Sequence, residues 1–231
     1  MMRNIFIACD TNDVRKVKKI IKNSKIKSKK YKIGYKFGLE FFYSKNGRKF
    51  IEKLKVKNIW LDIKTFDIPN TSSAAIKSLK DIKSISYITV HVSGGLQMLR
   101  SIKNAAKKYN KKLKILGVTV LTSFSNSSIK KVGHTKSIKD LVRKQALLAR
   151  SAKLDGIVCS AHEIKVIKKV CKKMEIITPG IRFKGENLND QKRVMSPEEA
   201  FKNGATSIVM GRSLVNGNIK NNIKKLIKSL N

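Results

Sequence analysis

The amino-acid sequence predicts a single (β/α)8 barrel of the TIM type, an α/β fold. Short apolar runs alternate with longer amphipathic segments, there are eight such pairs in 231 residues, and polar side chains follow nearly every apolar run. Continuous apolar strands that alternate with helices form a parallel sheet covered on both faces, and eight units at this length fit a barrel. A doubly wound open sheet is the alternative. No linker divides the chain, so we expect residues 1–231 to form one domain.

The expected strands are short runs rich in Ile, Val and Tyr. In chain order they are Asn4–Cys9, Tyr31–Gly34, Ile59–Ile63, Tyr87–Val92, Ile115–Leu121, Gly156–Cys159, Ile176–Thr178 and Ser207–Met210. Most segments between them carry apolar residues at helical spacing. These expected helices are Asp13–Asn23, Leu39–Leu54, Thr71–Lys83, Gln97–Tyr109, Ile138–Ala152, Glu163–Lys173, Pro197–Asn203 and Ile219–Leu230. The longest irregular stretches are candidate active-site loops, and they span Ser123–Ser137 and Arg182–Ser196.

Residues capable of chemistry lie at or just after the ends of nearly all the expected strands. They are Asp10, Lys32, Asp62 with Lys64, His91, Thr122, Ser160, Pro179-Gly180 and Gly211-Arg212. The carboxyl ends of the strands of a barrel all lie on one face, and active sites are built there. We therefore expect these side chains to converge.

A charged segment is the most informative of these strand ends. Asp62 and Lys64 are two residues apart and point to the same side of a strand, and Asp67 follows the strand end. Burying such charges is costly unless they pair, so we predict a mutually charged network. Lys32, near Gly34 on the neighbouring strand, would extend it. A lysine kept protonated beside a carboxylate suits protonation of a carbanion, although spacing alone fits a structural ion-pair network equally well.

A phosphate site is expected on the opposite side of the barrel. The last strand runs into Gly211-Arg212, and Arg182 closes the preceding strand. Loops after the seventh and eighth strands of such barrels frequently bind phosphate, and an arginine adds a fork of donors. A Gly-Arg pair after a strand is common, so this expectation depends on the barrel.

The chain is strongly basic, with 52 Lys+Arg against 15 Asp+Glu and a net charge of +37. Such a charge suggests nucleic acid binding. Lysine is spread along the whole chain, however, and aromatic residues are only 6%, which disfavours a base-stacking surface. We therefore expect no specific nucleic-acid partner and interpret the excess as a solvated surface.

Three cysteines without CxxC spacing fit buried, reduced thiols in a cytoplasmic protein. No stretch approaches about 18 apolar residues, so we expect no membrane segment. The three histidines lack metal-ligand spacing, and we predict no metal site.

Nine motifs occur in an order that resembles one known family over essentially the whole chain, the bacterial orotidine 5'-phosphate decarboxylases. They are Ala8-Cys9-Asp10, Lys32-Ile33-Gly34, the Asp62–Thr71 run, His91-Val92-Ser93-Gly94-Gly95, Val118–Ser123, Val158-Cys159-Ser160-Ala161, Thr178–Arg182, Asp190-Gln191-Lys192-Arg193 and Gly211-Arg212. The Asp-x-Lys-x-x-Asp-Ile-Pro-Asn-Thr run is the most specific of them.

The resemblance implies decarboxylation of orotidine 5'-phosphate to uridine 5'-phosphate (UMP) and carbon dioxide, the last step of de novo UMP synthesis, without metal or organic cofactor. It implies that Lys64 protonates C6 of the pyrimidine, and that Asp62 lies beside the substrate carboxylate. Asp67 would act across a homodimer interface on the neighbouring site. Lys32 would order the charged network and contact the ribose.

The same resemblance implies a set of substrate-binding residues. Asp10 and Thr71 match ribose ligands, Thr71 also in trans, Thr122 lies where the pyrimidine is held, and Ile68 is expected to contact the substrate. The residues that match ligands around the phosphate are Arg182, Gln191, Gly211 and Arg212, with Gln191 on a mobile loop.

Two differences from the family pattern leave these roles intact. Thr65-Phe66 replaces the common Phe-His, and Lys192 stands where a second arginine is common. Related sugar-phosphate decarboxylases and aldolases share the Asp-x-Lys strand but use a divalent metal held by further carboxylates. The Ile68–Thr71 continuation argues against them, and the intact charged motif argues against an inactive scaffold.

Overall fold

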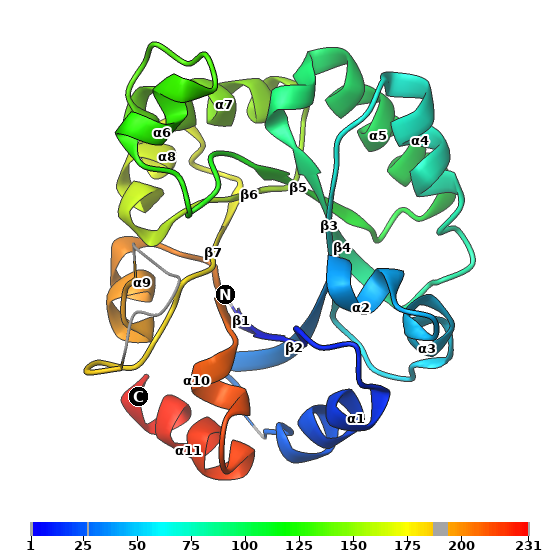
Figure 1. Cartoon of the computed structure of the whole chain (residues 1–231), viewed down its shortest axis with the longest axis vertical. Coiled ribbons are helices and arrows are strands. Elements are labelled where there is room, and N and C mark those ends of the chain that lie inside the picture. Colours follow the sequence, from blue (N-terminus) through cyan, green and yellow to red (C-terminus); the bar gives the residue numbers. More distant parts are fainter. Residues whose placement is uncertain (1, 27, 187–193, 231) are drawn as a thin grey trace.

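Eight parallel strands close into a barrel in the order of the sequence, as the computed structural model of the chain shows (Figure 1). The structure describes residues 2–26, 28–186 and 194–230. The strands are β1 (Arg3–Ala8), β2 (Tyr31–Gly38), β3 (Ile59–Thr65), β4 (Ile85–His91), β5 (Lys114–Val118), β6 (Gly156–Val158), β7 (Glu175–Thr178) and β8 (Ser207–Met210). Strand β1 pairs with both β2 and β8, so the ring is complete and the predicted (β/α)8 fold is confirmed.

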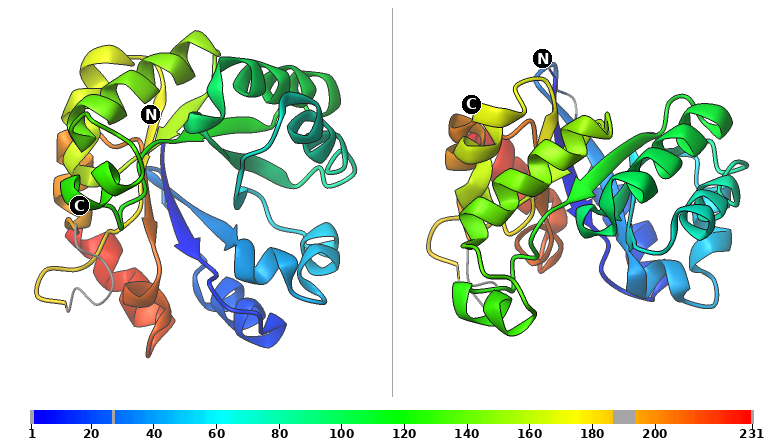
Figure 2. Two further views of the ribbon diagram at one scale, coloured as in Figure 1. Left: turned by 45° about the horizontal axis from the view of Figure 1, so that its top comes forward. Right: turned by 90° about the horizontal axis from the view of Figure 1, so that it is seen from above.

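Helices surround the barrel on its outer side, as three directions of view show (Figures 1 and 2). The described α-helices are α1 (Val14–Asn23), α2 (Leu39–Tyr43), α3 (Gly47–Lys53), α4 (Pro69–Lys77), α5 (Gly95–Tyr109), α6 (Asn126–Lys131), α7 (Ile138–Ser151), α8 (Ile164–Val170), α9 (Pro197–Asn203), α10 (Arg212–Val215) and α11 (Ile219–Ser229). Two 3-10 turns, η1 (Val92–Gly94) and η2 (Ala161–Glu163), precede α5 and α8. Apolar helix faces pack against the outside of the strands and form the larger part of the core.

A second, smaller apolar cluster fills the inside of the barrel. Phe6 contacts Trp60 and Tyr87 edge to face, with ring centroids 5.1 and 5.3 Å apart, and all three side chains are buried. Aromatic pairs favour this arrangement because the positive edge of one ring meets the negative face of the other. The cluster closes the barrel from within, so the space beyond it opens only toward the carboxyl ends of the strands.

The predicted helix Leu39–Leu54 is wrong, because the segment forms two helices, α2 and α3. The hydroxyl of Ser44 donates to the carbonyl of Phe41 at 2.7 Å, which ends the first helix. Gly47 then begins the second, and a Cβ atom at this position would lie only 1.6 Å from the same carbonyl oxygen. The chain therefore turns tightly here, and only glycine fits the turn.

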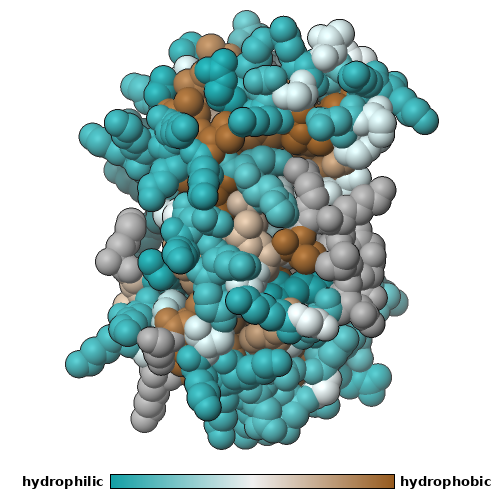
Figure 3. All heavy atoms as spheres, turned by 90° about the vertical axis from the view of Figure 1, so that its left-hand side faces the viewer, coloured by the Kyte–Doolittle hydropathy of each residue, from teal (hydrophilic) through white to brown (hydrophobic). Residues whose placement is uncertain are grey.

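The outer surface carries the excess of lysine. The face shown in Figure 3 is mostly hydrophilic, and apolar atoms show only in small areas between polar side chains. Large apolar side chains that are exposed elsewhere include Leu39, Tyr43, Phe66 and Ile68, which follow the neighbouring strands β2 and β3. Within the described ranges, no helix combines the length and apolar character needed to cross a membrane.

Candidate active site

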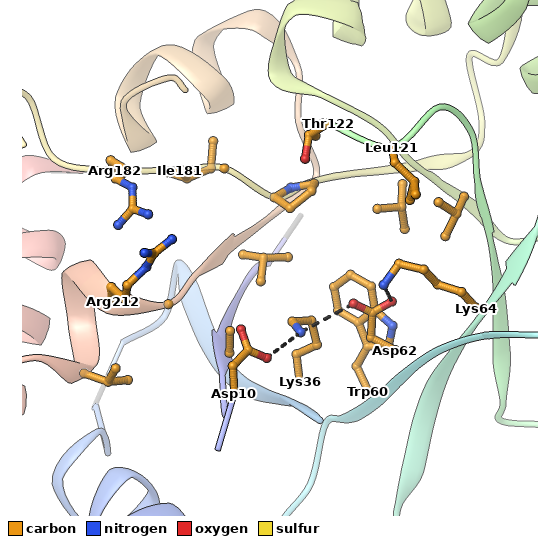
Figure 4. Close-up of a pocket in the computed structure, with 18 of the residues that line it drawn as sticks. Asp10, Lys36, Trp60, Asp62, Lys64, Leu121, Thr122, Ile181, Arg182 and Arg212 are labelled. Atoms are coloured by element: carbon orange, nitrogen blue, oxygen red, sulfur yellow. Dashed lines mark hydrogen bonds and ion pairs between the residues drawn. The ribbon is translucent and has the colours of Figure 1, made fainter. Parts of the chain in front are cut away.

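A cavity of about 500 Å³ opens at the carboxyl ends of the strands, above the aromatic cluster of the barrel. Its floor includes Trp60, and its walls come from β1, β2, β3 and the segments that follow β5, β6, β7 and β8. The volume lies within the range of sites for small organic ligands. Figure 4 shows charged side chains at two ends of this cavity, with carboxylates and lysines at one end and Arg182 and Arg212 at the other.

At the first end, two lysines flank one buried carboxylate. Asp62 Oδ1 lies 3.0 Å from Lys64 Nζ, and Asp62 Oδ2 lies 3.4 Å from Lys36 Nζ. Lys36 Nζ also donates to Asp10 Oδ1 at 3.0 Å. The four side chains therefore form an alternating row of charges, Asp10–Lys36–Asp62–Lys64, drawn in Figure 4. The alternation offsets the desolvation of Lys36 and Asp62, which are both buried.

The pKa values of this row favour the charged forms. Burial alone would raise the pKa of Asp62, but Lys36 and Lys64 outweigh it and hold this pKa below its ordinary 3.8. Burial would likewise lower the pKa of Lys36, but Asp62 and Asp10 raise it above 10.5. The desolvated carboxylate of Asp62 and the ammonium of Lys36 therefore both stay ionised at neutral pH.

A bulge in β3 positions Asp62 and Lys64, the two side chains at one end of the row of charges. Leu61 pairs with Ile88 and Thr65 with Val90, so three residues of β3 lie opposite Thr89 alone. Lys64 adopts a left-handed backbone conformation with φ of 48°, which is uncommon outside glycine. Bulges redirect side chains and often lie beside active sites. Here the bulge lets both Asp62 and Lys64 line the cavity.

The buried Thr89 side chain holds this bulge. Its hydroxyl accepts from the backbone N–H of Lys64 at 3.0 Å and donates to Asp62 Oδ1 at 2.9 Å. One side chain therefore fixes the backbone of the lysine and the orientation of the carboxylate. Sequence reasoning missed Thr89, because a threonine in an apolar strand gives no sign of its partners.

The prediction that Lys32 joins the charged network is wrong. Lys32 pairs with Asn4 near the start of β2, its side chain is exposed, and it does not line the cavity. The expected strand ended at Gly34, whereas β2 continues to Gly38 and carries Lys36 to the carboxyl end of the barrel. The signal that could have identified Lys36 is a second Lys-x-Gly, Lys36-Phe37-Gly38, four residues after the first.

The opposite end of the cavity is cationic, as expected. Arg182, Gly211 and Arg212 line it, and Thr122 lies on the wall between the two ends. Arg182 is buried, and its Nε has no hydrogen-bond partner among the described residues. A buried donor without a partner is costly, and an anionic ligand would satisfy it. Lys16 of α1, which the sequence analysis did not single out, also lines the cavity.

Three predicted site residues lie outside the cavity of this single chain. Asp67, Ile68 and Thr71 are exposed, and none of them lines the cavity. Asp67 Oδ1 accepts from the backbone N–H of Ile68 at 2.7 Å. Gln191, predicted on a mobile loop, falls outside the described residues.

Among residues 2–26, 28–186 and 194–230, no three His, Cys, Asp or Glu side chains gather in a way that could hold a metal ion. The three cysteines form no disulfide and are buried, as expected. The described cavity offers an ionised carboxylate between two lysines, with arginines placed to bind an anion.

Comparisons with known proteins give a consistent result. The profile of the orotidine 5'-phosphate decarboxylase / HUMPS family matches residues 3–224. The chain is 37% identical over 232 residues to orotidine 5'-phosphate decarboxylase of Buchnera aphidicola, covering 98% of this chain and 95% of the relative. It is 40% identical over 219 residues to the protein of the same name from Prochlorococcus marinus, covering 91% and 88%. The crystal structure of orotidine 5'-phosphate decarboxylase from Lactobacillus acidophilus superimposes with a TM-score of 0.84 at 28% identity, covering 99% of both chains.

Proposed function

The chain belongs to the orotidine 5'-phosphate decarboxylase / HUMPS family, and from this premise we propose how its cavity carries out the reaction. It is a carboxy-lyase that converts orotidine 5'-phosphate to UMP and carbon dioxide, the last step of UMP biosynthesis. The observation that carries the mechanism is the buried Asp62 carboxylate held between Lys36 and Lys64.

In the proposed mechanism, the pyrimidine lies over Asp62 and Lys64, and the phosphate lies at the arginines. The substrate carboxylate is held beside the carboxylate of Asp62, and their repulsion disappears when the group leaves as neutral carbon dioxide. The bond between C6 and the carboxylate breaks, the electron pair stays on C6, and a proton of the Lys64 ammonium moves to C6. Solvent then returns a proton to Lys64.

Lys36 positions Asp62 in this scheme and also contacts Asp10, which we assign to the ribose. Because the four charges are fixed by ion pairs before the substrate binds, little reorganisation is needed when negative charge develops at C6. Phosphate binding at Arg182 and Arg212, with Gly211 and Gln191, would supply binding energy remote from the reacting carbon. Thr122 is assigned to the pyrimidine.

We also propose a homodimer in which Asp67 and Thr71 complete the site of the partner subunit, with Ile68 as a further substrate contact. Two observations support it. These residues lie at the rim of the barrel but outside the cavity of their own chain. The apolar side chains of Leu39, Tyr43, Phe66 and Ile68 are 44 to 74% exposed on the same side, and such exposure is typical of an interface.

A direct test of the lysine mechanism is Lys64→Ala. We expect conversion of orotidine 5'-phosphate, followed by the decrease in ultraviolet absorbance, to slow by more than about 10³-fold, because the general acid is lost. UMP should still bind, because the phosphate site is intact. Arg212→Ala is the matched variant at the other end, and we expect it to raise KM more than it lowers kcat. Near-normal turnover by Lys64→Ala would refute the mechanism.

The same assay tests the alternative within the family, a metal-dependent sugar-phosphate enzyme. Full activity after dialysis against EDTA is expected for the decarboxylase. Failure to convert orotidine 5'-phosphate, together with turnover of a sugar phosphate that EDTA abolishes and magnesium restores, would favour the alternative.

Mixing two inactive variants tests the shared site. Lys64→Ala and Asp67→Ala homodimers are each expected to be inactive. If Asp67 acts in trans, subunit exchange creates hybrid dimers with one intact site, and about a quarter of all sites recover. A size tag on one variant shows whether the subunits have exchanged. If they exchange and activity does not recover, Asp67 acts in the site of its own subunit or takes no part in catalysis. We also propose a cytoplasmic location, because three buried cysteines without a disulfide fit a reducing compartment.

A further inference from the structure

The mouth of the cavity carries one cation that the proposed reaction does not use, Lys16. This residue lies in the first turn of α1 and is exposed, yet it lines the cavity together with Val215 and Asn216 of the α10 region. Helix α1 follows β1, and β1 pairs with β8, which leads into Arg212. Lys16 therefore stands next to the phosphate end of the cavity, on its solvent side.

No described carboxylate neutralises the Lys16 ammonium. Among the described residues, no carboxylate lies within ion-pair distance of it, and the nearby Asp13 caps the start of α1 by accepting from the N–H of Arg15 at 2.7 Å. The described lining of the cavity contains five cationic side chains and two carboxylates, Asp10 and Asp62. The Asp67 that we assign to the site from the partner subunit would add a third carboxylate, and bound UMP brings about two negative charges, so the case for a further anionic group rests on the position of Lys16 and not on the total charge.

We propose that Lys16 forms a subsite for a second phosphate group, so that the cavity binds a uridine nucleoside diphosphate more tightly than UMP. This inference rests on the proposed function, because it places the first phosphate at Arg182 and Arg212. The chain of phosphates would leave the cavity past Val215 and Asn216, toward Lys16. The diphosphate carries about one more negative charge than UMP, and the Lys16 ammonium would meet that charge. The consequence is competitive inhibition of the decarboxylase by nucleotides made from its own product.

The test uses the full-length protein and measures the inhibition constants of uridine 5'-diphosphate and UMP at constant ionic strength. For the unmodified protein we expect the diphosphate to bind about fivefold more tightly, the size of one charge-assisted contact at an exposed position. In Lys16→Gln this preference should disappear, with the affinity for UMP changed by less than about twofold. Thermal denaturation checks that the variant is folded.

Lys18→Gln is the matched control. It removes one positive charge from the same helix, and Lys18 is exposed but does not line the cavity. We expect its preference for the diphosphate to remain. Equal loss in Lys16→Gln and Lys18→Gln would mean that only the overall charge matters, and it would overturn the subsite. Equal binding of the diphosphate and UMP by the unmodified protein would overturn it as well. Failure of the protein to convert orotidine 5'-phosphate would instead refute the proposed function, and the subsite with it.

Discussion

Lys36 and Lys32 have the same side chain on the same strand but opposite surroundings. Lys36 is buried between two carboxylates, whereas Lys32 is exposed near the other end of the strand. Lys36→Ala should reduce kcat by at least about 10²-fold and destabilise the fold by about 3 kcal/mol, because Asp62 loses a buried partner. Lys32→Ala should leave both within the error of measurement. Steady-state kinetics and urea denaturation of the two variants check this, and equal effects would contradict the ion-pair geometry.

The pH dependence of stability follows from the direction of two pKa shifts. The pKa of Asp62 is lowered on folding, so its contribution is complete above its ordinary 3.8 and is lost as the pH falls through the lower value of the folded state. The pKa of Lys36 is raised, so its contribution is complete below 10.5 and is lost as the pH rises through the folded value. Between these limits the network should contribute a constant amount.

The matching experiment compares the melting temperatures of the unmodified protein and Asp62→Asn from about pH 7 down to about pH 3. The unmodified protein should be the more stable at neutral pH, and the difference should shrink as the carboxylate takes up a proton. A difference that stays constant down to the lowest pH would show that the Asp62 charge is not its source.

The residues of the site differ in how far the sequence could predict them. Asp62 and Lys64 lie near the end of β3, Arg212 follows β8, and the structure places all three around the cavity. The prediction of Lys32 is wrong because β2 does not end at Gly34: Tyr35, Lys36 and Phe37 continue the buried strand. Two Lys-x-Gly motifs four residues apart cannot be distinguished locally, because only the length of the strand decides which lysine reaches the site.

At the level of the elements, the bulge of β3 connects backbone conformation with chemistry. Thr89→Val removes the only side chain that bonds both the N–H of Lys64 and Oδ1 of Asp62 among the described residues. We expect a loss of about 1–3 kcal/mol in stability and about a tenfold lower kcat with little change in KM, because a buried N–H loses its partner at the reacting lysine. Thr89→Ser should restore most of both.

Thr178 of β7 offers a matched control for that prediction. It is also fully buried, and its hydroxyl has no hydrogen-bond partner in the described part of the chain. Thr178→Val should therefore be neutral or slightly stabilising. Equal effects of the two substitutions, measured by urea denaturation and kinetics, would mean that Thr89 acts through packing alone.

The strands and the long helices could be predicted from the sequence, and the short helices could not. The runs at Gly156–Val158 and Ser207–Met210 are short, apolar and bounded by polar residues, so they can be recognised as buried strands. Helices α6 and α10 have six and four residues, too few to show a helical period, and their segments were expected to be irregular or were not assigned. The division between α2 and α3 depends on the contact of Gly47 with Phe41, which no local pattern encodes.

For the molecule as a whole, the net charge of +37 opposes compactness. Raising the sodium chloride concentration from about 0.01 M to about 0.2 M shortens the screening length from about 30 Å to below 10 Å. We expect the melting temperature to rise by several degrees, because lysines on neighbouring helices repel one another less. A sucrose series of matched osmolality is the control, and an unchanged melting temperature in salt would show that surface repulsion costs little.

Trp60 gives the cavity an optical property. It is the only tryptophan of the sequence, and it forms part of the cavity floor beside the charged row. Indole emission responds to the polarity and the charges around the ring, so the tryptophan fluorescence of this protein comes from one point inside its active site. Nucleotide binding can therefore be titrated on the unlabelled chain by its emission spectrum, and a Trp60→Phe variant supplies the blank.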